Sequence, residues 1–242
     1  MQVKPYKHKE GSKKEQVAGM FDSIAYRYDF LNHFLSAGID KTWRKKAIAK
    51  LKGRNIANLL DIATGTGDFA IEASRRLNGV QIQGVDISEQ MLAVGREKLI
   101  KLSLQNQISL AYGDSENLNF QPNTFDAITA AFGVRNFENL NKGLTEMYRV
   151  MKPSGMVVIL EFSKPSKFPF KQLYNFYFKY ILPIIGKMVS KNNSAYAYLP
   201  ESVKHFPDGA AFVEKLKKAG FSDCNYKTLT FGVATIYTGV KK

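Results

Sequence analysis

The stretch LLDIATGTGDFAIEA, residues 59–73, joins an apolar run to a loop with Gly65 and Gly67 and then to a segment of helical character. A glycine loop between a strand and a helix lets backbone N–H groups approach an anionic or nucleotide-like ligand. The Walker-type phosphate loop ends in Gly-Lys-Ser/Thr, whereas here Asp68 follows Gly67, so that motif is excluded. Gly65, Gly67 and Ala70 do fit the Gly-x-Gly-x-x-Gly/Ala spacing of dinucleotide-binding folds, a weak match by itself.

Strand-like and helix-like segments alternate from residue 56 onward. This alternation predicts right-handed β-α-β units and a parallel sheet. We expect an α/β fold, doubly wound and Rossmann-like, with a mostly parallel seven-stranded sheet and an antiparallel C-terminal strand pair. The expected strands are IANLLDIA (56–63), VQIQGVDIS (80–88), QISLAYGD (107–114), FDAITAAFG (125–133), SGMVVILEF (154–162), CNYKTLTFG (224–232) and VATIYTGVKK (233–242).

The rest of the chain is expected to complete a single domain over residues 1–242. Residues 12–52 indicate N-terminal cap helices that could cover a pocket, and Ser12 and Glu15 have capping-box spacing at the start of the first helix. Residues 163–208 form an insertion rich in Lys, Phe, Tyr and Pro between the fifth strand and the C-terminal pair.

Composition narrows the class of protein. The net charge of +14 over 242 residues suggests nucleic acid, an anionic membrane surface or an acidic ligand, or only solubility. Cys224 is the single cysteine, which excludes an intramolecular disulfide and a multi-cysteine zinc site. His8 and His33 have no carboxylate or cysteine at ligand spacing, so we expect no metal. The polar, basic start lacks a secretory signal, and we expect a cytoplasmic protein.

Acidic residues follow three of the expected strands. Asp61, Asp86 and Asp114 stand at the carboxyl ends of the first three strands, which meet at one rim of a parallel sheet where α/β ligands bind. With Asp68 they would repel a pyrophosphate, but they suit S-adenosylmethionine, which carries an ammonium and a sulfonium and no phosphate. We therefore predict contacts from Asp61, Gly65, Gly67, Asp86 and Asp114 to this methyl donor. The alternative is that these aspartates are helix N-caps.

At these residues the sequence resembles class I S-adenosylmethionine-dependent methyltransferases, and specifically the ubiquinone/menaquinone biosynthesis C-methyltransferase family. The likeness covers nearly the whole chain. It rests on MFDSIAYRYDFLNHFLSAGIDKTWRKKA (20–47), LLDIATGTGDFA (59–70), GVDISEQMLAVGREKL (84–99), GDSENLNFQPNTFDAITAAFGVRNFENL (113–140), RVMKPSGMVVILEFSKP (149–165) and YLPESVKHFPDGAAFVEKLKKAGF (198–221). FGVRNFENL and LEFSKP are its most specific parts.

This resemblance implies methyl transfer to a ring carbon of a polyprenylated quinol, with demethylmenaquinol to menaquinol as the main expectation. It implies that Thr66, Asp86, Asp114 and Ser115 contact S-adenosylmethionine. Relatives often carry Ser where this chain has Ala131, so a hydroxyl contact there is not expected. Naphthoquinol or benzoquinol, the tail length and the oligomeric state stay open.

A quinol ring carbon becomes a better nucleophile when a neighbouring hydroxyl ionises, and a cation can favour that ionisation. Arg135 is the candidate cation, just past the fourth expected strand, and Asn136 could orient the same oxygen. The alternative for Arg135 is a surface salt bridge with Glu138. The candidates for the base are water, Tyr28, Glu161 and His205.

The insertion suggests a membrane encounter, since a polyprenyl tail leaves a bilayer only at high cost. Residues 163–198 carry six lysines and no acid, which favours an anionic surface. Phe168, Phe170, Phe176 and Phe178 could enter the interface, so we expect a peripheral membrane protein. The alternative is a core-packed helix with a solvated lysine face.

Other functions fit less well. Another small-molecule or lipid methyltransferase, acting on a benzoquinol, a sterol-like lipid or a phenol, is the nearest alternative. An RNA-binding methyltransferase is suggested by charge alone, but AAFGVRN stands where an Asn-Pro-Pro-Tyr-type motif would follow the fourth strand. We therefore expect no nucleic-acid partner.

Overall fold

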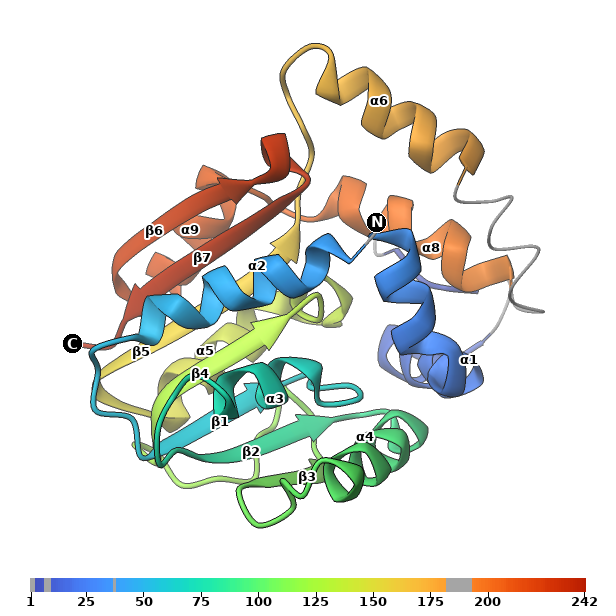
Figure 1. Ribbon diagram of the computed structural model, residues 1–242. Coiled ribbons are helices and arrows are strands. Elements are labelled where there is room, and N and C mark those ends of the chain that lie inside the picture. Colours follow the sequence, from blue (N-terminus) through green and yellow to red (C-terminus); the bar gives the residue numbers. More distant parts are fainter. Residues whose placement is uncertain (1–2, 7–9, 37, 182–192) are drawn as a thin grey trace.

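A computed structural model describes residues 3–6, 10–36, 38–181 and 193–242 (Figure 1). Its centre is one seven-stranded sheet in the order β3-β2-β1-β4-β5-β7-β6. Strands β1 to β5 pair in parallel, and β7 pairs antiparallel with β5 and with β6. The strands are β1 Asn58–Ile62, β2 Gln81–Asp86, β3 Ile108–Tyr112, β4 Phe125–Ala131, β5 Met151–Phe162, β6 Ser222–Leu229 and β7 Ala234–Val240.

The predicted fold class is confirmed, including the antiparallel C-terminal pair. Several strand ends differ from the expected ranges by one to three residues. One difference is that β5 begins at Met151 rather than at Ser154, because Met151 pairs with Phe125 at the start of β4. Between β6 and β7 lies the short 3-10 turn η4, Thr230–Gly232, within the range expected for the sixth strand.

Helices cover both faces of the sheet. They are α1 Lys13–Leu35, α2 Ile39–Ile48, α3 Asp68–Ser74, α4 Glu89–Lys101, α5 Leu140–Val150, α6 Phe170–Phe176, α8 Asn193–His205 and α9 Ala210–Lys218. Apolar side chains of α2, α3 and α4 form one core cluster with one face of the sheet, and those of α5 and α9 form a second with the other face. Burial of these two clusters is the main source of stability of the fold.

The carboxyl ends of the parallel strands point toward α1 and α8, as the arrows of β2 and β4 show in Figure 1. The start of α1 is fixed by the predicted capping box, which is confirmed: Ser12 N donates to Glu15 Oε2 at 2.8 Å, and Glu15 N to Ser12 Oγ at 3.2 Å. Helix α6 stands apart from the sheet at the top of Figure 1, followed by the π-helical turn η3, Tyr177–Ile181. These elements enclose the site.

Candidate functional site

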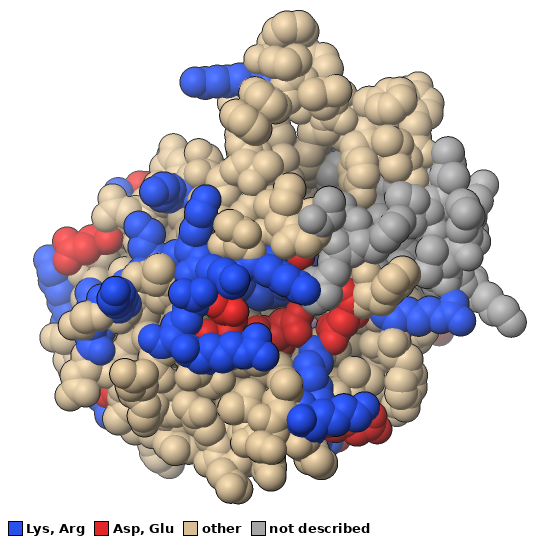
Figure 2. Space-filling model, in the orientation of Figure 1, with Lys and Arg blue, Asp and Glu red and all other residues tan. Residues whose placement is uncertain are grey.

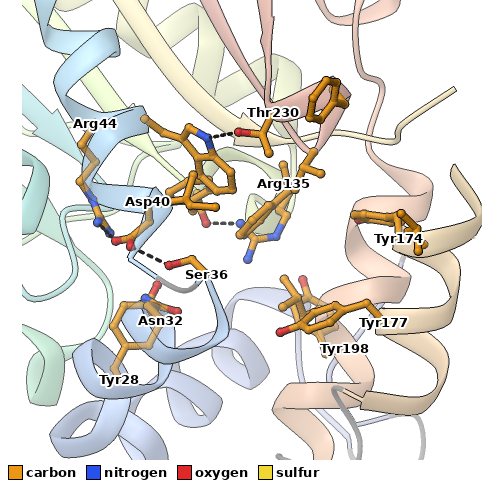
Figure 3. Close-up of a pocket in the computed structure, with 18 of the residues that line it drawn as sticks. Tyr28, Asn32, Ser36, Asp40, Arg44, Arg135, Tyr174, Tyr177, Tyr198 and Thr230 are labelled. Carbon is orange, nitrogen blue, oxygen red and sulfur yellow. Dashed lines mark hydrogen bonds and ion pairs between the residues drawn. The ribbon is translucent and has the colours of Figure 1, made fainter. Parts of the chain in front are cut away.

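A cavity of about 430 Å³ lies beyond the carboxyl ends of β4 and β5, between α1, α2, α6 and α8 (Figure 3). Its floor is aromatic: the ring centroids of Phe132 and Phe162 are 4.4 Å apart, and Trp43 lies 6.1 Å from Phe132. The Trp43 indole is oriented by a 2.8 Å hydrogen bond that its Nε1 donates to Thr230 Oγ1. A flat, ring-shaped ligand fits a floor of this kind.

One wall of this cavity carries Arg135, from the 3-10 turn η2, Val134–Asn136, directly after β4. Its Nη1 forms a 2.8 Å ion pair with Glu161 Oε1, and the two side chains are 6% and 0% exposed. Burial raises the pKa of Glu161, and the positive charge of Arg135 opposes that rise. The structure therefore gives Arg135 a buried partner on β5 and corrects the alternative of a surface salt bridge with Glu138.

The opposite wall is polar and comes from α1 and α2. Ser36 Oγ donates to Asp40 Oδ1 at 2.6 Å, and the other carboxylate oxygen of Asp40 is ion-paired with Arg44. Tyr28 and Asn32 line the same side (Figure 3). The guanidinium of Arg44 lies 5.8 Å from the centre of the Phe132 ring, so this wall continues the aromatic floor.

A second, narrower cavity of about 60 Å³ adjoins the glycine loop. Phe21, Tyr28 and Phe132 line both cavities, so the two are neighbours. Of the residues predicted as site residues, the narrow cavity brings together five: Gly65, Asp86, Asp114, Ser115 and Asn136. Arg135 lines the large cavity instead.

Asp86 holds the glycine loop at the edge of the narrow cavity. Its Oδ2 accepts a 2.8 Å hydrogen bond from Gly65 N, and its Oδ1 accepts one of 2.9 Å from Ser88 N. Burial raises the pKa of Asp86 to about 6, against these backbone hydrogen bonds, which lower it. Gly65 has φ +56°, a conformation that favours glycine.

The other loop residues lie outside both cavities. Asp61 is fully buried in β1 and accepts from Thr129 Oγ1 at 2.6 Å and from Thr64 Oγ1 at 2.7 Å. Burial raises its pKa to about 6. Thr66 Oγ1 donates to Asp29 of α1, and Gly67 is the N-cap of α3. Asp61 and Thr66 therefore support the loop through hydrogen bonds to neighbouring side chains.

Helix α1 lies against the rim of the narrow cavity. Lys14 Nζ forms a 2.6 Å ion pair with Asp114 Oδ2 and lies 3.6 Å from Glu116 Oε2. Asp22 of the same helix accepts from Ser88 Oγ at 2.6 Å. Two carboxylates at the rim, those of Asp114 and Glu116, therefore already lie next to an ammonium group, that of Lys14.

Two glycines that line the narrow cavity are closely packed against neighbouring side chains. A Cβ on Gly133 would lie 2.4 Å from the Cβ of Ala63, and one on Gly113 would lie 3.0 Å from the Cβ of Val85. A Cβ at position 133 would collide with Ala63, so glycine is required there, whereas a Cβ at position 113 would press on Val85. The described residues contain no group of three or more His, Cys, Asp or Glu side chains that could hold a metal ion.

Sequence reasoning missed Lys14, Asp40, Arg44 and Tyr198 as lining residues. Asp40 and Arg44 lie within the motif block 20–47, and Tyr198 begins the block 198–221. Membership of these blocks is the signal that could have identified them. No local pattern marks Lys14, because its partner Asp114 is 100 residues away in the chain. Two residues considered as bases are displaced from the cavity: Glu161 is buried behind Arg135, and His205 is exposed on α8.

Comparison with known proteins gives a match to the model of the ubiE/COQ5 methyltransferase family over residues 9–241. The chain is 52% identical to the demethylmenaquinone methyltransferase of Bacteroides fragilis, over 99% of this chain and 97% of that protein. It is 47% identical to the ubiquinone/menaquinone biosynthesis C-methyltransferase UbiE of Geotalea daltonii, over 95% and 97%.

Solved structures match at lower identity. A S-adenosylmethionine-dependent methyltransferase of Thermotoga maritima, a possible histamine N-methyltransferase, has a TM-score of 0.66 at 17% identity, over 93% of this chain and 99% of that one. The [4+2]-cyclase SpnF has a TM-score of 0.68 at 16% identity, over 94% and 96%. These likenesses show the Rossmann-like methyltransferase fold alone, since a cyclase shares it.

Proposed function

The chain belongs to the ubiE/COQ5 methyltransferase family, and we propose that it methylates a ring carbon of a polyprenylated quinol, most directly demethylmenaquinol, with S-adenosylmethionine as donor. The observation that carries this proposal is the pair of adjoining cavities at the carboxyl end of the sheet. One is lined by carboxylates beside a glycine loop, and the other has an aromatic floor with Arg135 in its wall.

The narrow cavity fits the chemistry of S-adenosylmethionine, which when bound supplies an electrophilic methyl group on a sulfonium. The carboxylates of Asp86 and Asp114 can accept hydrogen bonds from hydroxyl, amino and ammonium groups. Asp114 already accepts one from the ammonium group of Lys14. Asn136 Oδ1 is buried without a hydrogen-bond partner among the described residues, so it can accept from a ligand. We propose that Gly65, Asp86, Asp114 and Ser115 touch the ligand and that Asp61, Thr66 and Gly67 shape the loop.

The narrow cavity is smaller than the several hundred Å³ of an ordinary small-molecule site. Helix α1 limits it, since Lys14, Phe21 and Tyr28 of this helix are among its lining residues. We infer that α1 shifts outward when the donor binds, and that Lys14 then releases Asp114. This ion pair is partly exposed, with 28% and 25% of the two side chains accessible, so its release costs little.

The large cavity is proposed to hold the quinol ring. A phenol with a pKa near 10 is ionised about one part in a thousand at pH 7, a cost of roughly 4 kcal/mol. A neighbouring cation lowers such a pKa by about 1–3 units. Only Nη1 of Arg135 donates to Glu161. The Nε of Arg135 has no partner among the described residues, so the guanidinium can also act on a quinol oxygen. We propose that Asn136 orients the reacting groups from the neighbouring cavity.

Three protein groups were considered as the base that removes the ring proton. Glu161 is buried in its ion pair, and His205 lies outside the cavity, on the surface. Tyr28 lines both cavities, but burial raises its pKa and keeps the phenol protonated. These positions favour water as the base.

We further propose that the protein binds a membrane peripherally through α6 and its flanks. Phe168 is 80% exposed, and Leu173 and Phe176 of α6 are 60% and 55% exposed. The top of Figure 2, where Figure 1 places α6, is mostly neither basic nor acidic. Apolar side chains gathered this way on one protruding helix suit the interface of a bilayer. Phe170 is instead half-buried and stacks on Phe231 at 3.7 Å.

The electrostatic part of this proposal rests on fewer lysines than the sequence suggested. Lys164 is ion-paired with Asp208 at 3.2 Å, while Lys167 and Lys171 are exposed. Lys187, Lys191 and the side chains of Lys179 and Phe178 lie outside the described residues. No helix among the described parts of the chain is long and apolar enough to cross a bilayer. We also infer that residues 1–242 work as one domain, since α1, the sheet and the insertion all line the large cavity.

The test of the activity is methyl transfer to a short-tail demethylnaphthoquinol, followed by mass spectrometry with and without reductant. We expect product only with the reduced ring, because the oxidised ring is electron-poor. Calorimetry with S-adenosylmethionine and with NAD tests the donor, and tighter binding of NAD would refute it. In a host strain lacking the gene, a demethylated quinone should accumulate. Methylation of a benzoquinol, sterol-like or phenolic compound alone would favour the alternative.

The test of membrane binding is co-sedimentation with neutral and anionic vesicles at low and high salt. Binding should increase with anionic lipid and weaken with salt. Phe168→Ser should weaken binding, whereas Ile100→Ser should not, because Ile100 is 64% exposed on α4, far from α6 in Figure 1. Equal loss in both variants would contradict the assignment of the membrane face to α6.

A further inference from the structure

Tyr198 has a hydroxyl that the fold leaves unsatisfied. This residue of α8 is only 4% exposed, and its ring packs with Val17 and Met20 of α1. Its hydroxyl is buried and has no hydrogen-bond partner among the described residues. Buried tyrosine hydroxyls ordinarily find a partner, so this one calls for an explanation. Tyr237, which is equally buried, shows the ordinary case, since its hydroxyl accepts from Gly209 N at 2.8 Å.

The residue that carries this unsatisfied hydroxyl lines the large cavity. Tyr198 and Arg135 both line it. Figure 3 shows Tyr198 across the space from Tyr28 and Asn32, with Arg135 above and between them. The charges of Arg135 and Glu161 both act on Tyr198, which indicates that the three groups are close. Arg135 Nε is a second buried donor without a partner among the described residues. Two unsatisfied donors at one cavity indicate a missing acceptor.

We propose that the Tyr198 hydroxyl donates a hydrogen bond to the substrate oxygen that lies beside Arg135, which makes Tyr198 a catalytic residue. This inference rests on the proposed function, because the acceptor is an oxygen of the quinol ring. Burial raises the pKa of Tyr198 to about 12, so the hydroxyl stays protonated and donates throughout the working range of pH. It therefore assists ionisation without titrating.

The hydrogen bond should count more in the transition state than in the ground state. A hydrogen bond to an ionised oxygen is about twice as strong as one to a neutral oxygen. As the quinol oxygen becomes negative, the contact from Tyr198 strengthens together with that from Arg135. The consequence is an effect on kcat that exceeds the effect on KM.

Tyr198→Phe tests this assignment, with reduced short-tail demethylnaphthoquinol as the probe. We expect kcat to fall about 10- to 100-fold, with the affinity for S-adenosylmethionine unchanged. The acidic limb of the pH–rate profile should move to higher pH, because ionisation of the quinol becomes harder. The melting temperature should not fall, since the lost hydroxyl has no partner in the fold.

Tyr237→Phe is the matched control, because it removes a hydroxyl that does have a partner, outside the large cavity. Its melting temperature should fall while kcat is retained. If Tyr198→Phe keeps the kcat and pH profile of the wild type, the proposed role of the Tyr198 hydroxyl is overturned. The proposed function would still stand in that case, because the wild type methylates the quinol. A lowered melting temperature with activity lost only in proportion to the unfolded fraction would assign Tyr198 a structural role. A wild type inactive on every quinol would refute the proposed function, and the proposal would fall with it.

Discussion

Replacing Arg135 separates its role in chemistry from its role as the partner of a buried carboxylate. Arg135→Met removes the guanidinium and keeps similar bulk. It also leaves Glu161 fully buried without the partner that now lies at 2.8 Å. Breaking a buried ion pair in this way typically costs about 3–5 kcal/mol of stability, because the remaining charge is uncompensated. A loss of activity in this single variant could therefore come from unfolding alone.

The double variant Arg135→Met with Glu161→Gln removes both charges. Two backbone N–H groups now donate to different oxygens of Glu161, that of Phe162 to Oε1 and that of Arg135 to Oε2. The amide at position 161 keeps one acceptor oxygen and so satisfies one of these two N–H groups. We expect stability to recover to within about 1–2 kcal/mol of the wild type, since replacing both members of a buried pair is often nearly neutral. The kcat should nevertheless stay about 10²- to 10³-fold low, as for loss of a group that stabilises a developing oxyanion.

The dependence on pH distinguishes the two variants further. Loss of Arg135 raises the pKa of Glu161 in the folded state, because the positive charge that opposed desolvation is gone. A raised folded pKa means stability that is present at low pH and lost as pH rises through that pKa. The loss of stability in Arg135→Met should therefore be smaller at pH 5 than at pH 8. This dependence on pH should be absent from the double variant, which lacks the Glu161 carboxyl. For catalysis, higher pH should partly rescue both, because hydroxide then ionises the quinol.

The measurements are urea unfolding across pH, calorimetry with S-adenosylmethionine, and a methyl-transfer time course with reduced short-tail demethylnaphthoquinol. The affinity for S-adenosylmethionine should change little, since Arg135 lines the other cavity. Wild-type kcat in the stable double variant would refute the reasoning. It would reduce Arg135 to the structural counter-ion of Glu161 and leave the activating group unidentified.

Three further substitutions test the donor side of the site. Asp86→Asn should weaken S-adenosylmethionine binding about 10- to 100-fold in calorimetry. The two oxygens of Asp86 accept from Gly65 N and from Ser88 N, and an amide has only one oxygen. Unchanged affinity would remove Asp86 from the site. Lys14→Ala should tighten that binding several-fold at a cost of under about 1 kcal/mol in stability, because it frees the partly exposed Asp114; weaker binding would instead make Lys14 a ligand contact. Burial raises the folded pKa of Asp61 from 3.8 to about 6, so the wild type should lose about 3 kcal/mol of its free energy of unfolding as pH rises from 4 to 7. Asp61→Asn should not show this loss. Equal pH slopes in urea unfolding of the two proteins would contradict the raised pKa.

The sequence by itself determined the fold and the order of its elements. Alternating apolar segments and helical repeats are local signals, set by the periods of strands and helices, and they gave the parallel sheet with its antiparallel end. The glycine loop and the acids after the strands likewise followed from short-range spacing. The rule that parallel strands end at one rim then placed Gly65, Asp86 and Asp114 together, as the structure does.

Only the tertiary structure decided how the charges pair and which residues enclose the large cavity. Arg135 meets Glu161 across 26 residues of chain, not its near neighbour Glu138, because β4 and β5 are adjacent in the sheet and the pair is excluded from water. Lys14 forms its ion pair with Asp114 because α1 packs over the end of the sheet. Tyr198 lines the same cavity as Arg135 because α8 packs there as well. Periodicity reports the face that a helix buries, but which distant residues that face meets depends on the packing of the whole chain.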